Sequence, residues 1–434
     1  MTARKLGVAK RFFAALLAGF TLVVSSCGLP AEPIDTTDSP DWLDPDVTRV
    51  VAPGGDDPDD TTKSEPIPPV TTKAPETTAP KSDESRVSFL AAGDNIIHEQ
   101  VYVDAKNRAA KSGDKSKKYD FVSMYADISD FIASADLAFV NQETPLGGDE
   151  LGIAGYPNFN GPQDAGKALV EVGFDIVNIA TNHMLDKKEA GLKGSIDFWN
   201  SQPVTLLGGY YDDADYENIR VVEKNGIKIA FVSYTYGLNG MTLPASSKIH
   251  IPLIDQTEIV RMVGKAKKLA DVTICVMHWG VDGSTTVTNE QKTLAKAITD
   301  AGADVILGMH SHTLQPIEWQ TGKDGNRTLV IYSLGNFLNA QYDSINLVGG
   351  IMTFDIVKKN GKTTIEDPVL NPVVVWYNAD RLGFQLYLLK DFTETLASTH
   401  GTVKYGKLKT FTVDTAKGFV TSAISKEFLP DFLK

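Results

Sequence analysis

The sequence predicts a layered α/β fold, and three observations lead to this prediction. Short β-branched or apolar runs alternate along the chain with stretches of helical periodicity, the order expected of a sheet with helices on its faces. About 350 residues follow the N-terminal region, enough chain for one large α/β domain or for one domain with an appendage. Polar clusters stand where several of the predicted strands end.

Each predicted strand is an apolar run bounded by turn residues. In chain order, the runs are 86–92, 137–140, 176–180, 227–234, 272–277, 305–307 and 329–332. The run 351–357 is followed by Asn360-Gly361, which predicts a hairpin because Asn-Gly suits a tight turn between antiparallel strands. Residues 372–377 predict a further strand.

Helices are expected between the strands, where apolar residues recur with a helical period. The expected ranges are 124–133, 165–172, 192–199, 257–269 and 290–301. The last 50 or so residues are mixed in character and give no clear functional signal.

Residues 1–27 are interpreted as a lipoprotein signal peptide. Four basic residues precede the apolar run 12–24, which is too short to span ~30 Å of hydrocarbon at ~1.5 Å per residue. The run ends at Ser25-Ser26-Cys27, which resembles the lipobox of bacterial lipoproteins, in which the cysteine is lipidated and becomes the mature N-terminus. An uncleaved signal anchor with an incidental Cys27 is the alternative.

Lipidation of Cys27 places the expected protein outside the cytoplasm, anchored to the bacterial cell membrane. The other cysteine, Cys275, lies in an apolar run and is expected to be a small buried hydrophobe. The mature chain then has no disulfide, so its stability must come from its core, to which metal binding can add.

Residues 28–85 are expected to be a disordered linker. They hold 11 of the 21 prolines, and 14 acidic residues against 4 basic ones. Such a segment repels itself and stays extended, which suits a spacer that holds a domain off a membrane surface. The whole chain carries a net charge of −13, which argues against nucleic acid as a partner.

Five of the seven histidines lie where predicted strands end, beside Asp, Asn, Gly or Trp. Imidazoles, carboxylates and amides at strand exits are what a metal site at a sheet edge requires. The clusters are Gly93-Asp94, Asn141-Gln142-Glu143-Thr144-Pro145, Asn182-His183 with Asp186, His278-Trp279-Gly280, Gly308-Met309-His310-Ser311-His312 and Tyr332-Ser333-Leu334-Gly335-Asn336-Phe337. Together they resemble the CapA-type proteins of poly-γ-glutamate capsule synthesis, a family related to the calcineurin-like metallophosphoesterases.

The resemblance covers roughly residues 86–345 and implies a four-layer αββα sandwich of the metallophosphoesterase type. Residues 346–434 would add C-terminal strands that complete the sandwich, and a mixed tail. The resemblance also implies two divalent metal ions at the sheet edge, and the donor types suit Mn, Zn or Fe.

The expected ligands follow from the resemblance, position by position. One ion would be held by Asp94, Glu143 and His312, and the other by Glu143, Asn182, His278 and His310, with Glu143 as the bridge. His183 would donate a proton to a leaving group, and Asp186 would orient its ring. His310 and His312 are expected on an extended segment that points both imidazoles to one side.

The chain departs from the pattern of the superfamily at several positions. Ile96 stands where phosphoesterases usually have a histidine, and His98 either replaces that imidazole or simply starts a helix. The bridging position is Glu143 instead of the usual aspartate. Lys188 stands where CapA-type proteins often have glycine, and Lys187 and Lys188 either line the rim of the site or form a solvated face.

Other residues keep two interpretations. Asp94 is a metal ligand or a helix N-cap. Asn336 either turns the chain or contacts a ligand. Trp279 and Phe337 are interpreted as packing residues. The loop that contains Tyr156, Asn158 and Asn160 is expected to cover the site.

Three functions remain open at this stage. The first is a part in capsule synthesis, export or anchoring through the dinuclear site, with poly-γ-glutamate and membrane subunits of a capsule synthase as partners. The second is a metal-dependent phosphomonoesterase or phosphodiesterase acting on an envelope or extracellular ester. The third is a metal-stabilised, non-catalytic scaffold. Ligands alone do not name a substrate.

Overall fold

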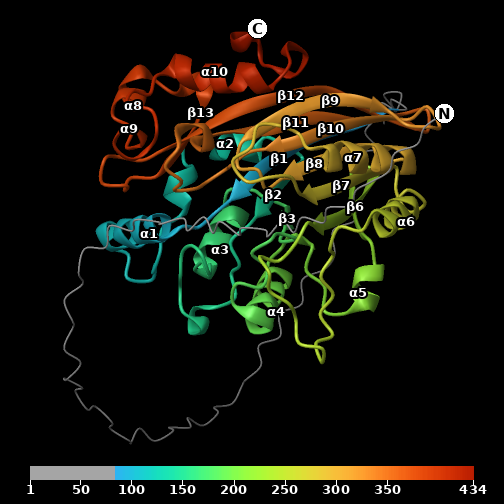
Figure 1. Ribbon diagram of the computed structural model, residues 1–434, viewed down its shortest axis with the longest axis horizontal. Helices are drawn as coiled ribbons and strands as arrows, with labels where there is room; N and C mark the ends of the chain where they lie inside the picture. Colours follow the sequence, from blue (N-terminus) through green and yellow to red (C-terminus); the bar gives the residue numbers. More distant parts are fainter. Residues whose placement is uncertain (1–83) are drawn as a thin grey trace, which may run out of the picture. The chain divides into compact units, whose positions relative to one another are not determined.

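The computed structural model describes residues 84–434 (Figure 1). The expected signal peptide, Cys27 and nearly all of the expected linker lie outside the described residues. From residue 84 onward, no helix is long and apolar enough to cross a membrane.

One sheet has seven strands in the order β13-β12-β11-β1-β2-β3-β4. Strands β1 to β4 run parallel, and β11, β12 and β13 add to the β1 edge in antiparallel fashion. The strands are β1 (Glu84–Asn95), β2 (Leu137–Gln142), β3 (Ile176–Asn178), β4 (Thr205–Leu207), β11 (Val348–Lys359), β12 (Lys362–Trp376) and β13 (Gln385–Leu388).

A second sheet has six strands in the order β5-β6-β7-β8-β10-β9. Its four central strands are parallel, and the antiparallel strands β5 and β9 form its edges. The strands are β5 (Arg220–Lys224), β6 (Ile227–Thr235), β7 (Val272–His278), β8 (Val305–Met309), β9 (Leu314–Thr321) and β10 (Arg327–Leu334).

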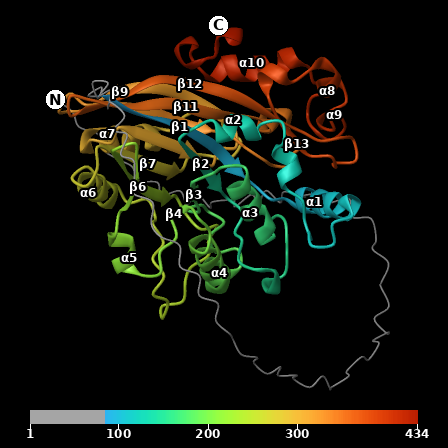
Figure 2. The same cartoon turned by 180° about the vertical axis from the view of Figure 1, so that it is seen from behind.

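Helices cover the outer faces of both sheets, as Figures 1 and 2 show from opposite sides. One apolar cluster lies between the sheets, a second lies under α1, α3 and α4, and a third lies under α6 and α7. The layered prediction is therefore confirmed. The helices are α1 (Glu99–Ser112), α2 (Ser129–Ala133), α3 (Gln163–Glu171), α4 (Lys188–Asn200), α5 (Asp213–Glu217), α6 (Gln256–Ala266), α7 (Asn289–Ala301), α8 (Glu394–Ser398), α9 (Thr402–Tyr405) and α10 (Val413–Ala423).

Strand β1 illustrates why the parallel strands are apolar throughout. Phe89 and Ala91 belong to the cluster between the sheets, whereas Leu90 and Ala92 belong to the cluster under the helices. Successive side chains of a strand point to opposite faces, and both faces are covered here.

The structure differs from the sequence-based expectations at two elements. The helix expected at 124–133 is a 3-10 turn (Val122–Tyr125) followed by α2, with Ile128 at φ −126° and ψ −4° between them. The strand expected at 372–377 is the end of β12, which begins at the Asn360-Gly361 turn and pairs with β11.

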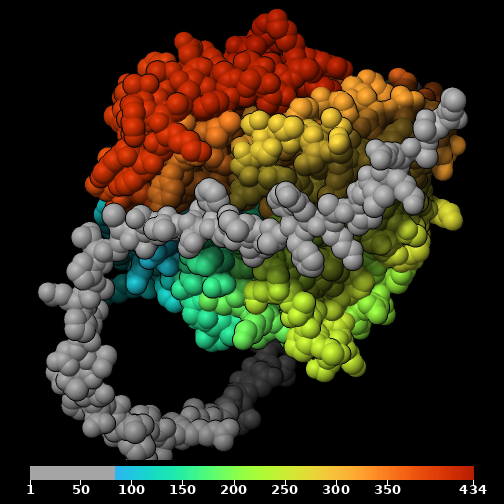
Figure 3. Space-filling model, viewed as in Figure 1, coloured from blue at the N-terminus to red at the C-terminus, as the bar shows by residue number. Residues whose placement is uncertain are grey.

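The C-terminal segment packs on the same domain. Helix α10 contacts β9 and β11, and Phe411, Val420 and Phe428 join the apolar cluster between the sheets. In the space-filling view of Figure 3, this segment (red) lies on the strands coloured orange.

The two sheets meet at the carboxyl ends of β1 and β10. The backbone N–H of Asp94 donates to the carbonyl of Gly335 at 2.9 Å, and the N–H of Phe337 donates to the carbonyl of Asp94 at 2.8 Å. A Cβ at Gly93 would lie 2.0 Å from the carbonyl oxygen of Gly335, so only glycine permits this approach. The junction places the end of β1 beside the polar loops of the second sheet.

Candidate metal centre

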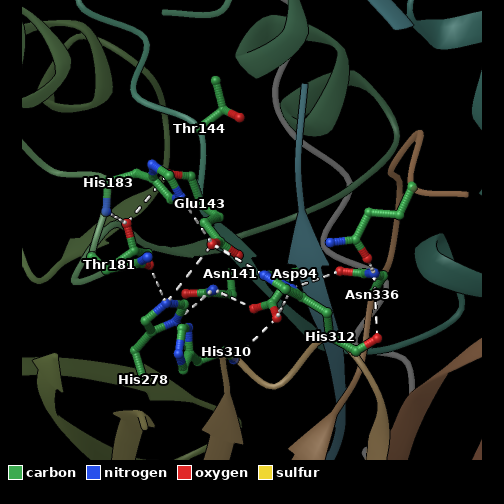
Figure 4. Close-up of polar contacts among 12 residues, drawn as sticks. Asp94, Asn141, Glu143, Thr144, Thr181, His183, His278, His310, His312 and Asn336 are labelled. Atoms are coloured by element: carbon green, nitrogen blue, oxygen red, sulfur yellow. Dashed lines mark hydrogen bonds and ion pairs between the residues drawn. The ribbon is translucent and has the colours of Figure 1, made fainter. Parts of the chain in front are cut away.

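Polar side chains from several strand ends meet at one edge of the two sheets (Figure 4). Carboxyl ends of parallel strands lie at the same edge, where loops build ligand sites. The six residues expected as ligands are all buried there, at or just after the ends of β1, β2, β3, β7 and β8: Asp94, Glu143, Asn182, His278, His310 and His312.

Asp94, Glu143 and His312 form the first candidate ligand group, with their ligand atoms within 4.8 Å of one another. The ring of His312 lies between the two carboxylates. Its Nδ1 is 3.2 Å from Oδ2 of Asp94, and its Nε2 is 3.7 Å from Oε1 of Glu143. Two carboxylates and an imidazole are a donor set that binds divalent transition metals.

Glu143, His278 and His310 form the second group, also within 4.8 Å. Nε2 of His278 is 3.9 Å from Oε1 of Glu143 and 2.8 Å from Oδ1 of Asn182, which brings the amide oxygen to the same place. Glu143 belongs to both groups. Its carboxylate is therefore the shared donor.

Two buried atoms of these groups have no hydrogen-bond partner among residues 84–434: Oε2 of Glu143 and Nδ1 of His310. Leaving a buried polar atom unpaired costs about 1–3 kcal/mol. A divalent cation coordinated by these atoms would remove that cost. The residues present therefore fit a metal ion.

Electrostatics in the site couple the carboxylates to the imidazoles. Burial raises the pKa of Glu143, and the nearby charge of His312 opposes this shift. Burial also disfavours the charged form of His312, but Glu143 and Asp94 outweigh it and raise the pKa of His312. Burial lowers the pKa of His310 to about 3 and lowers that of His278 well below the usual value. His278 and His310 are therefore neutral at pH 7, the form that binds metal.

His183 and Asp186 form a pair beside the two groups. Nδ1 of His183 is 2.7 Å from Oδ2 of Asp186, which also accepts a 2.8 Å hydrogen bond from the backbone N–H of Phe159. Nε2 of His183 is 3.8 Å from Oε1 of Glu143. Nδ1 is hydrogen-bonded to Asp186, so Nε2 is the nitrogen that faces the two groups.

The backbone at His310 and His312 differs from expectation. The expected extended segment is wrong, because the two residues have φ of 94° and 57°, in the left-handed region. Non-glycine residues rarely adopt this conformation, which costs roughly 1–2 kcal/mol per residue. Both imidazoles nevertheless reach the site, each in a different ligand group.

His98 lies outside both groups. It precedes α1, and its Nδ1 accepts a 3.2 Å hydrogen bond from the backbone N–H of Ala340. Burial lowers the pKa of His98 to about 3. His98 thus starts a helix and lines the cavity described below, without joining a ligand group.

The structure also shows the surroundings of the other residues that had two interpretations. Asn336 contacts Nδ1 of His312 through Oδ1 at 3.1 Å and also donates to the carbonyl of Asn346. Trp279 and Phe337 are buried packing residues. Asp94 caps no described helix, since His98 stands at the start of α1.

A cavity of about 570 Å³ opens over the two ligand groups. Tyr156 and Asn158 line it, as expected of the covering loop, whereas Asn160 is buried and accepts a hydrogen bond from the backbone N–H of Gly147. Lys187 and Lys188 are not among its lining residues.

The cavity also has lining residues that the sequence-based reasoning missed: Tyr236, Asn239 and Asp282. Tyr236 and Asn239 follow the end of β6, and Asp282 follows the end of β7. Their position just after parallel strands was the available signal, because the predicted strands at 227–234 and 272–277 end at this edge of the sheet.

Beneath the groups, buried amides link strands of both sheets. Asn178 donates to Oδ1 of Asn141 at 2.6 Å, and Asn141 donates to Oδ1 of Asp94 at 2.7 Å. The hydroxyl of Ser233, on β6 of the second sheet, hydrogen-bonds Asn178. The chain of amides fixes the orientation of the Asp94 carboxylate.

Two packed sheets with helices on their outer faces and a candidate metal centre at the sheet edge define an α/β sandwich protein with a candidate metal-binding site. A family model described as bacterial capsule synthesis protein PGA_cap matches residues 88–341, more than half of the chain. The chain belongs to this family, and this membership supports a capsule-related function.

Two curated relatives carry capsule names. The PGA biosynthesis protein CapA of Bacillus subtilis is 32% identical over 211 residues, which is 46% of this chain and 51% of that protein. The capsule biosynthesis protein CapA of Bacillus anthracis is 31% identical over 176 residues, covering 40% of this chain and 42% of that protein. The chain therefore matches about half the length of these relatives.

Solved structures resemble the chain more distantly. The calcineurin-like phosphoesterase YfkN of Bacillus subtilis is 13% identical with a TM-score of 0.40, covering 74% of this chain and 95% of that chain. A 5'-nucleotidase precursor of Thermus thermophilus is also 13% identical with a TM-score of 0.40, covering 70% of this chain and 54% of that chain.

Proposed function

We propose that this chain is a metal-dependent phosphoesterase of the cell envelope that works in poly-γ-glutamate capsule synthesis, through a dinuclear site that shares Glu143. The observation that carries this proposal is the pair of ligand groups with one carboxylate in common. The unpaired Oε2 of Glu143 supports it, because a bridging carboxylate uses both of its oxygens. Asp94 and His312 would hold one ion, and Asn182, His278 and His310 the other.

Two ions held in this way would polarise a phosphate ester and activate water for attack on phosphorus. Side chains of the protein would supply the proton for the leaving group. Asp186 accepts a hydrogen bond from Nδ1–H of His183 and so holds the ring with Nε2 toward the ligand groups. As the P–O bond breaks, His183, protonated on both ring nitrogens, would give its Nε2 proton to the departing oxygen and become neutral.

The test is hydrolysis of bis(p-nitrophenyl) phosphate by the full chain with added Mn²⁺. We expect turnover in the wild type, loss of turnover in His278→Ala, and wild-type turnover in His250→Ala. The second variant is the matched control, because His250 lies outside the cavity and contacts Asp213. A metal-loaded, folded wild type without turnover would contradict the proposal.

We also propose that Cys27 carries a lipid that anchors the protein outside the cytoplasm. Support comes from the sequence alone, in the basic start, the short apolar run and the small residues before Cys27. Metabolic labelling with a radioactive fatty acid should label the wild type and leave Cys27→Ala unlabelled. Labelling of Cys27→Ala would contradict the anchor.

A role in binding the capsule polymer itself is the second candidate, and the capsule relatives support it. It predicts that immobilised full chain retains poly-γ-glutamate only when metal is present. Absence of retention at low ionic strength, with metal bound, would exclude it.

A further inference from the structure

The charge of the cavity lining restricts what the cavity binds. Among the described residues, no lysine or arginine lines it, while the carboxylates of Glu143, Asp186 and Asp282 do. Apart from the proton that His183 would carry, positive charge for an anionic ligand must therefore come from cations held by the two ligand groups. Cations at the two ligand groups can neutralise one anionic group of a ligand. A second anionic group further along the ligand would face the carboxylates of the lining.

A polyanionic chain fits this lining poorly. Each carboxylate brought into the cavity without a cationic partner loses hydration that the uncharged amides of the lining replace only in part. Asp282, which is exposed, adds repulsion at the rim. The remaining polar lining includes the uncharged amides of Asn158, Asn239 and Gln341, which suit hydroxyl and carbonyl groups.

Two tyrosines at the cavity offer ring surface. Tyr156 is 76% exposed and Tyr236 is 46% exposed, although both line the cavity. Each ring packs against another ring. Tyr156 packs edge-on against Phe159 with ring centroids 6.1 Å apart, and the ring centroids of Tyr236 and His310 are 4.4 Å apart. Tyrosines held in this way expose apolar area that a ring of the ligand can cover.

We propose that the substrate of this site is a phosphate ester whose alcohol half is uncharged and carries a ring, and that the polyanionic polymer does not enter the cavity. The inference rests on the proposed phosphoesterase function. The phosphate group lies at the two ligand groups, and the ring of the alcohol half lies against Tyr156 and Tyr236.

The test measures binding to the Mn²⁺-loaded full chain by calorimetry, with phosphonates that cannot be hydrolysed. Phenylphosphonate should bind roughly tenfold tighter than methylphosphonate, because stacking on an aromatic side chain contributes on this scale. Tyr156→Ala and Tyr236→Ala should weaken phenylphosphonate and leave methylphosphonate unchanged. The control variant Tyr405→Ala, an exposed tyrosine outside the cavity, should change neither.

A γ-linked glutamate hexamer should bind far more weakly than phenylphosphonate, and Asp282→Lys should strengthen its binding several-fold. The proposal is overturned if the hexamer binds as tightly as phenylphosphonate, if the ring adds no affinity, or if both phosphonates lose affinity equally in the tyrosine variants. Binding as expected without hydrolysis of the chromogenic ester would overturn the phosphoesterase function alone. Hydrolysis without any gain from the ring would overturn this inference alone.

Discussion

Asn141 donates a hydrogen bond of 2.7 Å from Nδ2 to Oδ1 of Asp94, and the same Nδ2 lies 3.5 Å from Nδ1 of His278. One amide thus contacts a member of each ligand group. Partners of this kind hold ligands in the orientation that the metal requires. Asn141 received no role from the sequence, although it stands two residues before Glu143.

Replacing Asn141 by alanine should weaken metal binding by roughly 10- to 100-fold, since the carboxylate of Asp94 loses the donor that orients it. Mn²⁺ titration of the metal-free protein measures the change. Asn371→Ala is the matched control, because its half-buried amide lies on β12 and donates to Oγ1 of Thr353, outside the cavity. Equal Mn²⁺ affinities of the wild type and of Asn141→Ala would show that Asn141 does not orient the metal ligands.

His183→Ala should lower the hydrolysis rate by roughly 10²- to 10⁴-fold, the usual contribution of a general acid. Its metal content should stay at the wild-type level, because His183 belongs to neither group in which ligand atoms converge. Elemental analysis and turnover on the same preparations separate the two effects. A rate equal to that of the wild type would exclude His183 as the proton donor.

Glu143→Gln should reduce metal content at both positions, since it removes the anionic donor that the two groups share. In the wild type, a chelator should lower the melting temperature by several degrees, because a ligand that binds only the folded state stabilises it. In Glu143→Gln this difference should largely disappear. Glu171→Gln, which changes an exposed carboxylate at the end of α3, should behave like the wild type.

His400 predicts a pH dependence of stability away from the metal centre. Nε2 of His400 donates to the carbonyl of Val375 at 2.8 Å, and Nδ1 accepts from the N–H of Thr402, a bond that requires the neutral ring. Burial lowers the pKa of His400 to about 4, below the value of about 6.5 in the unfolded chain. The unfolded state then binds more protons between these values, and stability falls as the pH drops from 6.5 to 4.

The free energy of unfolding in urea, measured for the wild type and for His400→Gln, tests this dependence. At pH 7 the wild type should be the more stable. By pH 4.5 its advantage should shrink by about 2.5 kcal/mol, the part of the effect of this shift that falls between pH 7 and pH 4.5. A difference between the two proteins that does not change with pH would contradict the prediction.

Much of the fold could be predicted because its parallel strands are apolar on both faces. The run 272–277 and strand β7 (Val272–His278) coincide almost residue for residue. The C-terminal segment could not be assigned in the same way. Its apolar residues, such as Phe411 and Phe428, follow no simple period, and the surface that they cover belongs to strands distant in the sequence.

The candidate site likewise has residues that the sequence indicates and residues that only the structure reveals. Asp94, Glu143 and His278 stand at strand ends, where local sequence already indicates the edge of the sheet. Tyr236 and Asp282 also follow strand ends, but only the packed structure shows that they line the cavity over the ligand groups. The left-handed backbone at His310 was hidden for a different reason, since positive φ is uncommon for every residue other than glycine.

The left-handed conformations of His310 and His312 set stability against function at these two positions. Glycine adopts such φ values without steric cost, so His310→Gly and His312→Gly relieve the backbone while removing an imidazole each. With a chelator present, so that bound metal adds no stability, a screen of random variants for heat resistance should therefore enrich glycine at 310 and 312 and yield proteins that bind cations weakly. Engineering of a more durable form has to leave these two residues unchanged.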